Sequence, residues 1–400
     1  MTPGQAPREH VLVVNTGKPE AVTRLVRSFD VRCTVLTEEQ YARLYPNHQS
    51  VVTVRRIEDT DLVVTAARRV HHDDPFLRVV APTERSILPG AHVRRALCLE
   101  GLDVATAERF TDKLRMKEAL RRAGLPTALF TSTHDQRAAL AFLRASTQGC
   151  VLKPARGSGS IGAVRLGPGD DVPPCAWTSR MLLERVVPME AELHSEGLVR
   201  NGVVEASRAY EYAEPVLGTE GRLSGSFPVD DERVRDVRVM HQRVVSALGF
   251  RRGTTHLQLF ATRSGLVVNE IACRPPGGGI PEQVRRSGGF DVWKEFLAAE
   301  LGRGEARGGD IETDAGGVTR VKLPLPRGRV TSVEGFEQLV SRDGIDGTVH
   351  FAVGDEPPAV IHSGAVGGLL FADAATWPPR DVFDLVSRTF RFRSDAEEAP

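Results

Sequence analysis

A glycine-rich loop, Gly157-Ser158-Gly159-Ser160-Ile161-Gly162, is the feature that most limits what this chain can fold into. A β-prone run precedes it (150–154, CVLKP), and a second one follows it (163–166, AVRL). A dinucleotide-binding loop requires a helix after the glycines, so the context rules that class out. A Walker-type phosphate loop is also excluded, because no Gly-Lys-Ser/Thr follows. The loop is therefore predicted at the tip of a hairpin, where it either wraps a polyphosphate with its backbone N–H groups or is a flexible turn without a ligand.

The first hundred residues alternate short apolar runs with helical patterns. We expect strands near 11–15, 32–37, 51–54, 62–64 and 77–81, and a helix that runs through Arg27. Alternation of this kind is typical of a small parallel α/β domain, here predicted over 1–105.

The middle of the chain is rich in strands. Asp112 and Gly124 bracket a capped helix. Further helices are expected at 134–146, 231–248 and 290–301, and strands at 128–130, 150–154, 163–166, 181–187, 193–199, 203–212, 254–262 and 266–273. This pattern predicts an α+β domain on an antiparallel sheet over 106–305. A Gly-rich linker (303–317) leads to a small C-terminal α+β domain (306–393) with short strands and a helix near 380–388, and residues 394–400 are expected to be disordered.

Composition removes several classes of function. The chain has 52 basic and 52 acidic residues, so its formal net charge is zero and bulk charge would not hold it on nucleic acid. Five scattered cysteines without a CxxC indicate reduced thiols rather than a disulfide framework or a zinc site. Apolar stretches are far shorter than the roughly 20 residues that a membrane span needs. We expect a cytoplasmic protein without nucleic-acid or membrane partners.

Lysine is scarce, which makes each lysine informative. The chain has six, at positions 18, 113, 117, 153, 294 and 322, among 52 basic residues. Lys113 begins the capped helix, and Lys153 lies on the strand that leads into the glycine loop. A solvated surface lysine is the usual alternative, but these two placements favour a function.

Four stretches, in this order and spacing, resemble the ATP-grasp superfamily: TDKLRMKEAL, VLKPARGSGSIGAV, LLERVVP and VNEIACRPPGGG. The resemblance spans about 105–300 and is most similar to the amino-acid and dipeptide ligase branch. It implies an ATP-grasp fold with a parallel α/β domain before it and a small domain after it. It also implies ATP as the nucleotide, with Lys113, Lys153 and the 157–162 loop at its phosphates.

The same resemblance assigns the adenosine contacts. Glu184 would accept from the adenine amino group or hold the hinge, and Arg185 and Val187 would contribute to that hinge, Val187 through its backbone. Glu192 resembles the ribose-binding acid, but Glu190 stays an alternative because the spacing is ambiguous.

The resemblance also implies Mg²⁺, which Mn²⁺ could replace. Glu270 matches one metal carboxylate, and Gln258 stands where the family's other carboxylate is usual. Ala272 stands where an Asn is usual. Strand alternation places Glu270, Ala272 and Arg274 on one face, with Asn269 on the other. A Gln oxygen can ligate Mg²⁺ but brings no charge, so one ion could dominate over two.

The resemblance further implies a reaction. A carboxylate takes the γ-phosphoryl group, and the acyl phosphate meets an amine, giving an amide, ADP and phosphate. Arg274 would stabilise the transferring charge, together with the Gly277-Gly278-Gly279 turn. The expected partners are small carboxylate and amine substrates of amino-acid type, and a homodimer is a possible assembly. The alternatives are an ATP-binding protein with regulatory or impaired activity, bicarbonate-dependent carboxylation and phosphorylation.

Other candidates carry less support. His71-His72-Asp73-Asp74 is expected in a solvated loop rather than at a metal. His194 and His256 are either near the site or ordinary strand histidines. The substrate acid could meet Arg208, Arg285 or Arg286, which we do not rank.

Overall fold

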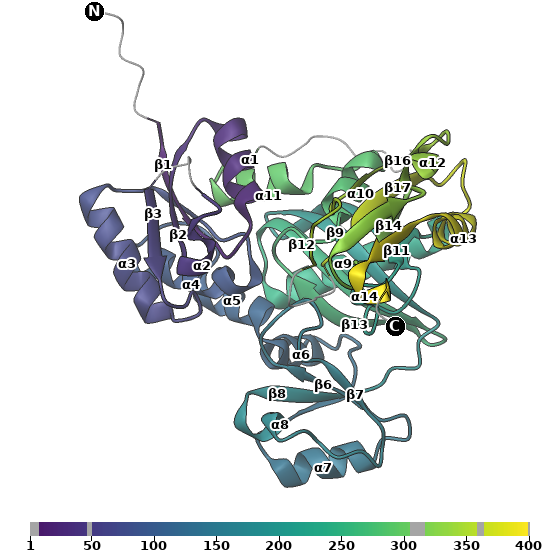
Figure 1. Ribbon diagram of the computed structural model, residues 1–400. Helices are drawn as coiled ribbons and strands as arrows, with labels where there is room; N and C mark the ends of the chain where they lie inside the picture. Colours follow the sequence, from purple (N-terminus) through teal and green to yellow (C-terminus); the bar gives the residue numbers. More distant parts are fainter. Residues whose placement is uncertain (1–7, 46–49, 305–316, 358–363, 399–400) are drawn as a thin grey trace, which may run out of the picture.

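The computed structural model describes residues 8–45, 50–304, 317–357 and 364–398. It has an N-terminal lobe, a lower lobe built on a small sheet, and a long sheet that continues into the C-terminal segment (Figure 1). No helix within these ranges is long and apolar enough to cross a membrane. The predicted linker (303–317) lies mostly outside the described residues.

The N-terminal lobe is a four-stranded parallel sheet covered by helices, as predicted. Its strand order is β3-β2-β1-β4. The strands are β1 (His10–Val14), β2 (Arg32–Glu38), β3 (Ser50–Val54) and β4 (Arg78–Val80), and the helices are α1 (Pro19–Phe29), α2 (Glu39–Ala42), α3 (Thr60–Asp73) and α4 (Glu84–Ala96). Apolar side chains from both faces of the sheet form two clusters, so each face packs against helices.

Two sequence predictions fail in helix α3. The run at 62–64 was expected to be a strand, but it lies inside the helix, because Asp59 caps the first turn by accepting from the Leu62 amide (3.2 Å). His71 and His72, expected in a loop, occupy the last turn of α3. Asp74 pairs with Arg32 on β2, so this segment is a structural helix end.

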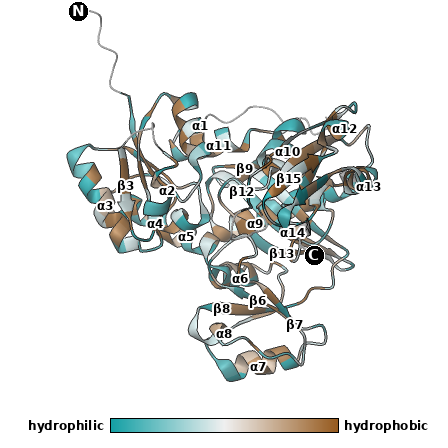
Figure 2. Cartoon of the chain, viewed as in Figure 1, coloured by the Kyte–Doolittle hydropathy of each residue, from teal (hydrophilic) through white to brown (hydrophobic). Residues whose placement is uncertain are grey.

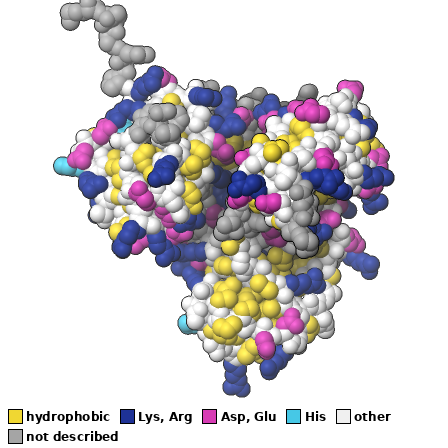
Figure 3. Space-filling model, viewed as in Figure 1, with side chains coloured by type: hydrophobic (Ala, Val, Ile, Leu, Met, Phe, Trp, Pro, Cys, Tyr) yellow, Lys and Arg dark blue, Asp and Glu magenta, His cyan; other side chains and the backbone are white. Residues whose placement is uncertain are grey.

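The lower lobe holds the glycine loop. Its antiparallel sheet has the order β5-β8-β6-β7, and β6 and β7 pair as the predicted hairpin. The strands are β5 (Phe130–Ser132), β6 (Cys150–Pro154), β7 (Val164–Leu166) and β8 (Met181–Arg185), accompanied by α7 (Gln136–Arg144) and α8 (Cys175–Thr178). Helix α7 carries both brown and teal residues in Figure 2, and its buried Ala139 and Leu143 pack into the lobe's own core. Hydrophobic side chains also gather over this lobe on the face shown in Figure 3.

Helices α5 (Val104–Thr111) and α6 (Lys113–Arg122) connect the N-terminal lobe to the lower lobe. Asp112 caps α6 as predicted, because its carboxylate accepts from the Leu114 and Arg115 amides (3.1 and 3.2 Å). This cap fixes where α6 begins and therefore where Lys113 lies.

The long sheet has eight strands in the order β13-β12-β9-β10-β11-β14-β17-β16. Its strands are β9 (Ala191–Arg200), β10 (Val203–Tyr212), β11 (Ser224–Pro228), β12 (Arg252–Thr262), β13 (Gly265–Ala272), β14 (Val318–Leu323), β16 (Ile345–Val349) and β17 (Gly368–Asp373). The pairing of β11 with β14 carries the sheet across the predicted boundary at 305–306. Helix α9 (Asp231–Leu248) packs on it through Val237, Val244 and Leu248.

Helix α11 (Val292–Glu300) anchors the N-terminal lobe. Its Trp293, Phe296 and Leu297 are buried in the same apolar cluster as Val11 and Leu25 of that lobe. The helix therefore follows the strand-rich region in sequence but packs on the N-terminal sheet, as Figure 1 also shows.

The C-terminal end is more ordered than expected. Strand β18 (Arg391–Ser394) pairs with β15 (Val330–Glu334), and α14 (Asp395–Glu398) follows. Asp395 accepts from the Arg329 amide (2.9 Å), which ties α14 to the segment just before β15. The prediction of disorder from 394 is wrong as far as residue 398. Three more helices complete the fold: α10 (Ile280–Arg286), α12 (Phe336–Val340) and α13 (Pro379–Thr389).

Candidate active site

Two adjoining cavities lie where the lower lobe faces the long sheet. The sheet cavity, about 920 Å³, is lined by β6, the glycine loop, the end of β8 and the 214–222 segment. The interlobe cavity, about 660 Å³, is lined by the N-terminal lobe, the glycine loop, β12, β13 and β14. Lys113, Gln258, Glu270 and the loop line both, so the two cavities meet at these groups.

The structure brings nearly all of the predicted site residues together. The sheet cavity is lined by Lys113, Lys153, Gly157, Ser158, Gly159, Ser160, Ile161, Gly162, Glu184, Arg185, Val187, Glu192, Gln258 and Glu270. Arg274 lines the adjoining interlobe cavity. Side chains separated by more than 150 residues in sequence therefore face one space.

The glycine loop has a backbone that needs its glycines. Gly157, Gly159 and Gly162 have φ values of 134°, 71° and 74°, and Ser160 also has a positive φ of 60°. Residues with side chains adopt this region rarely. Lys113 Nζ donates to the Gly157 carbonyl at 2.7 Å, which ties the N-terminus of α6 to the loop.

A buried lysine–glutamate–lysine group lies beneath the loop. Glu184, 4% exposed, forms ion pairs with both Lys153 and Lys117. Lys117 also donates to the Thr127 hydroxyl (3.0 Å) and the Asn269 carbonyl (2.9 Å). Glu184 therefore fixes the positions of two ammonium groups beneath the loop.

Lys117 is a residue that our sequence reasoning missed, although lysine scarcity pointed to it. Lys18, Lys113, Lys153 and Lys322 line the cavities, and Lys117 supports Lys153 through Glu184. Five of the six lysines are thus at this site, and Lys294 lies exposed on α11. Burial lowers the pKa of Lys153 to about 8, so an anion in the cavity would favour its protonated form.

The two predicted metal ligands lie side by side. Gln258 on β12 and Glu270 on β13 are cross-strand partners, which places their Cβ atoms about 5 Å apart. Burial acts to raise the pKa of Glu270, but the Lys113, Lys153 and Lys117 ammonium groups outweigh it and lower this pKa to about 2. Glu270 is therefore an anion at neutral pH, as a hard divalent cation requires of its ligand.

A β-bulge corrects the predicted face of Asn269. The β12–β13 register passes from Gln258–Glu270 to Leu259–Val268, which leaves Asn269 as the extra residue. Asn269 consequently lines the sheet cavity beside Glu270, and its Oδ1 accepts from Lys153 Nζ at 3.3 Å. Strict alternation had placed Asn269 on the opposite face.

Of the two acids considered for the ribose, Glu192 faces the cavity. Its Oε2 accepts from the Val216 amide (2.9 Å), and burial raises its pKa to about 7. Glu190 is half exposed and lies 3.5 Å from the Arg263 guanidinium. The geometry therefore favours Glu192.

The interlobe cavity is lined by basic groups from distant segments. Arg274 Nε donates to Glu84 at 2.9 Å, and Lys18 Nζ donates to the Pro275 carbonyl at 3.4 Å. Arg320 and Lys322 on β14 line the same cavity. Our sequence reasoning missed Lys18, Arg320 and Lys322.

The three arginines proposed for the substrate acid are not among the cavity-lining residues. Arg285 and Arg286 lie on helix α10, where both pair with Glu282. Arg208 lies on β10, opposite Glu196 in the β9–β10 register.

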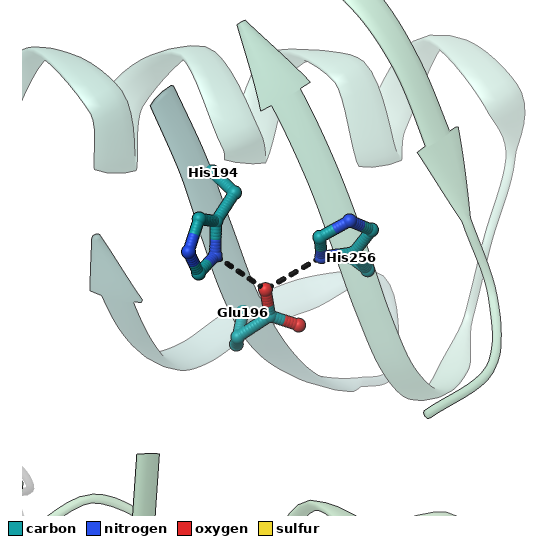
Figure 4. A group of neighbouring side chains, drawn as sticks. All are labelled: His194, Glu196 and His256. Carbon is teal, nitrogen blue, oxygen red and sulfur yellow. Dashed lines mark hydrogen bonds and ion pairs between the residues drawn. The ribbon is translucent and has the colours of Figure 1, made fainter. Parts of the chain in front are cut away.

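His194 and His256 flank Glu196 on the long sheet (Figure 4). Their Nδ1 atoms lie 3.0 and 2.6 Å from Glu196 Oε1, and the cluster is largely buried. His256 also lines the interlobe cavity, two residues before Gln258. Both histidines are therefore near the site.

Ligases that act on amino acids are similar to this chain in sequence. The chain is 26% identical over 351 residues to an L-arginine-specific L-amino acid ligase of Bacillus subtilis, covering 82% of this chain and 84% of that protein. It is 28% identical over 179 residues to a D-alanine–D-alanine ligase of Mycolicibacterium smegmatis, covering 39% of this chain and 48% of that enzyme. No protein-family model matches the chain.

Solved structures superimpose on this chain over nearly its whole length. An L-amino acid ligase from Bacillus licheniformis superimposes with a TM-score of 0.77 at 17% identity, covering 98% of this chain and 100% of that one. An N5-carboxyaminoimidazole ribonucleotide synthetase from Thermotoga maritima gives a TM-score of 0.70 at 15% identity, covering 97% and 100%. With the lysines, the glycine loop and Glu270 in place, the chain has the ATP-grasp fold.

Proposed function

We propose that this protein is an ATP-dependent carboxylate–amine ligase that joins amino acids through an acyl phosphate and releases ADP and phosphate. The observation that carries the proposal is the meeting of the two cavities at Lys113, the glycine loop, Gln258 and Glu270. A nucleotide in the sheet cavity would direct its phosphates to the place where the interlobe cavity opens. Transfer of a phosphoryl group from a nucleotide in one cavity to an acceptor in the other requires the two cavities to adjoin.

The sheet cavity supplies groups for each part of ATP. Lys113 and Lys153 are point charges beside the glycine loop, suited to phosphate oxygens. Arg185 ends β8 and Val187 follows it, and both offer backbone groups to the adenine edge. Glu192 offers a carboxylate to the ribose.

Glu270 and Gln258 fit Mg²⁺ or Mn²⁺, because both present oxygen ligands at the junction of the two cavities. The metal would neutralise charge on the transferring phosphoryl group.

The interlobe cavity would hold the two amino acids. A substrate carboxylate oxygen attacks the γ-phosphorus, and the bond between that phosphorus and the bridging oxygen to ADP breaks. The amine then attacks the acyl carbon and expels phosphate. Arg274 is placed to stabilise the charge of the acyl phosphate, while Lys18 and Arg320 can meet substrate carboxylates.

The two relatives support amino acids as the substrates. One is named for L-amino acid ligation and the other for D-alanine–D-alanine ligation. Bicarbonate-dependent carboxylation is the alternative left open by the sequence, so bicarbonate belongs among the substrates to be tested.

The test is release of ADP and phosphate from ATP and Mg²⁺ with pools of amino acids, read together with product masses. We expect release that requires a pool, and a product mass equal to two amino acids less one water. Release that requires bicarbonate instead, or ATP binding without release in any pool, would contradict the ligase.

Lys153→Ala and Lys294→Ala form a matched pair for this assay. Lys153→Ala should abolish ATP turnover with the circular dichroism spectrum unchanged, because Lys153 lies at the phosphates. Lys294→Ala removes an exposed lysine on α11 and should leave turnover unchanged. Turnover near the wild-type level in Lys153→Ala would show that the nucleotide lies elsewhere.

A further inference from the structure

Of the two ligands proposed for the metal, one is charged and the other is neutral. Glu270 contributes one carboxylate and Gln258 one neutral amide oxygen. Two positions along the same two strands, and so next on the same face, His256 on β12 pairs with Ala272 on β13. His256 and Gln258 share a face because they are two residues apart on a strand. Since Ala272 has only a methyl group, the space in front of the His256 ring is open to the cavity that both residues line.

The two nitrogens of His256 have different surroundings. Nδ1 lies 2.6 Å from Glu196 Oε1, so Nδ1 carries the hydrogen and donates to the carboxylate. Nε2 lies on the other side of the ring from Glu196 (Figure 4), and no side chain or backbone group in the described ranges hydrogen-bonds to it. A histidine fixed in this way presents an Nε2 lone pair, which is the usual arrangement of a metal-ligating histidine held by a carboxylate.

Glu196 is itself held in place from the opposite side. It is fully buried, and His194 Nδ1 lies 3.0 Å from the same Oε1 atom. His194 Nε2 lies 3.0 Å from the Ser226 hydroxyl, which in turn donates to Gln283 Oε1 at 2.9 Å. Both nitrogens of His194 are therefore occupied, whereas His256 keeps one for the cavity.

We infer that His256 Nε2 is a third protein ligand of the divalent cation held by Glu270 and Gln258, with Glu196 as the residue that positions it. The inference rests on the proposed function, because that function places the cation here. Diagonal neighbours across two strands lie about 7–8 Å apart, within reach of an imidazole and a carboxylate that share one ion. The site would then have one carboxylate, one amide and one imidazole.

This ligand set has a consequence for metal choice. Imidazole suits transition metals, while Mg²⁺ prefers oxygen ligands. We expect the protein to bind Mn²⁺ more tightly than Mg²⁺ in the presence of ADP. The dissociation constant for Mg²⁺ divided by that for Mn²⁺ should fall when His256 is removed.

A different ion position can be told apart from this one. An ion between the Nδ1 atoms of His194 and His256 and Glu196 would need metal–ligand distances of about 2.1 Å and would replace both hydrogen bonds. Such an ion would be bound without nucleotide. The cation proposed here faces the cavities, so its binding should depend on ADP.

The experiment uses the full-length protein labelled with ¹⁵N, to which unlabelled ADP and Mn²⁺ are added. Pulsed electron paramagnetic resonance should show a ¹⁵N coupling of a directly bound imidazole. The label separates protein nitrogen from adenine nitrogen. His256→Ala should remove the coupling and weaken Mn²⁺ binding about 10–100-fold, and Glu196→Gln should weaken it about tenfold. The exposed His72→Ala is the control and should change neither readout.

A second variant guards against a folding defect. Adding Ala272→Asn to His256→Ala should restore much of the Mn²⁺ affinity through an oxygen ligand, without the nitrogen coupling. ADP-dependent Mn²⁺ binding that lacks a ¹⁵N coupling in the wild-type protein would overturn the His256 assignment and leave the ligase proposal standing. Nitrogen-coupled Mn²⁺ that binds without ADP would also overturn it, in favour of the buried position. Absence of any ADP-dependent Mn²⁺ binding would contradict the proposed function itself.

Discussion

Replacing Glu184 by Gln tests whether the buried charge group beneath the glycine loop is held by one carboxylate. Glu184 lies on β8 in the interior of the small sheet, is 4% exposed, and pairs with Lys117 and Lys153. Gln has the same shape but no charge. The substitution therefore leaves two adjacent ammonium groups that have lost their shared anion.

Burial of the charges sets the loss of stability in Glu184→Gln, and proton release from a lysine limits that loss. Removing one member of a buried ion pair costs about 3–5 kcal/mol of stability. The protein can limit this cost by releasing a proton from one lysine. With an unfolded-state pKa of about 10.4, that release costs about 4.6 kcal/mol at pH 7 and about 1.9 kcal/mol at pH 9. We therefore expect a loss of about 4 kcal/mol at pH 7 that shrinks to about 2 kcal/mol at pH 9.

The direction of this pH dependence is fixed by proton linkage. As the pH rises from 7 to 9, the folded variant releases one lysine proton, while the unfolded variant keeps it. Unfolding then takes up a proton, so the stability of the variant rises with pH relative to the wild-type protein. Burial lowers the pKa of both Lys117 and Lys153, which is the condition that this direction needs.

Hydrogen exchange measured by mass spectrometry reads this effect locally. Peptides that cover β6 and β8 report the free energy of opening the lower lobe, after correction for the intrinsic exchange rate at each pH. Glu282→Gln on α10 is a surface control, since its pairs with Arg285 and Arg286 are solvent-exposed and worth at most about 1 kcal/mol. A loss below about 1 kcal/mol in Glu184→Gln, or the same loss at both pH values, would refute the reasoning.

Three further predictions address the metal, the ribose acid and the lobe contact. Gln258→Glu adds a carboxylate opposite Glu270 and should tighten Mn²⁺ binding about tenfold, whereas an unchanged titration would remove Gln258 from the site. Glu192→Gln should weaken ATP binding. It should also raise the free energy of unfolding by up to about 3 kcal/mol above pH 7 and by nothing below pH 4, because burial raises the pKa of Glu192 to about 7 and its ionised form opposes folding. Denaturant unfolding at several pH values checks this sign. Trp293→Ala should cost about 3–5 kcal/mol and expose the N-terminal lobe to limited proteolysis; wild-type resistance would contradict its anchoring role.

Local rules predicted the elements around the loop well. The strand expected at 150–154 is β6, with the same ends, and Asp112 caps α6 as expected. Capping and hairpin formation depend on residues close in sequence, so a single sequence contains the necessary information. The strand predicted at 62–64 was wrong, because three apolar residues fit a strand and a helix equally well. The Asp59 cap, which is also close in sequence, decides in favour of the helix.

The bulge at Asn269 could have been recognised in part. Val268 and Ile271 both face the apolar core, yet they are three residues apart. Strict alternation along a strand requires an even separation, so one residue between them must be extra. Strand pairing then decides which one it is, and that pairing is known only from the fold.

The basic groups from β14 lay beyond the reach of local rules. Arg320 and Lys322 line the interlobe cavity because β14 pairs with β11, nearly a hundred residues earlier in the chain. Their role depends on this long-range register. The prediction of a separate C-terminal domain obscured it, because the long sheet continues across that boundary.

The concentration of lysines explains why this site suits a polyanion. Lys113, Lys117 and Lys153 bring three positive charges, while Glu184 and Glu270 bring two negative ones. Burial makes the unmatched positive charge unfavourable, and it lowers the pKa of Lys153 to about 8. Phosphate oxygens in the sheet cavity would balance this charge. An Arg could not relieve the imbalance by releasing a proton, and its planar fork is larger than an ammonium group. A chain with mostly arginine has therefore kept lysine where a buried cation must exist both with and without its anion.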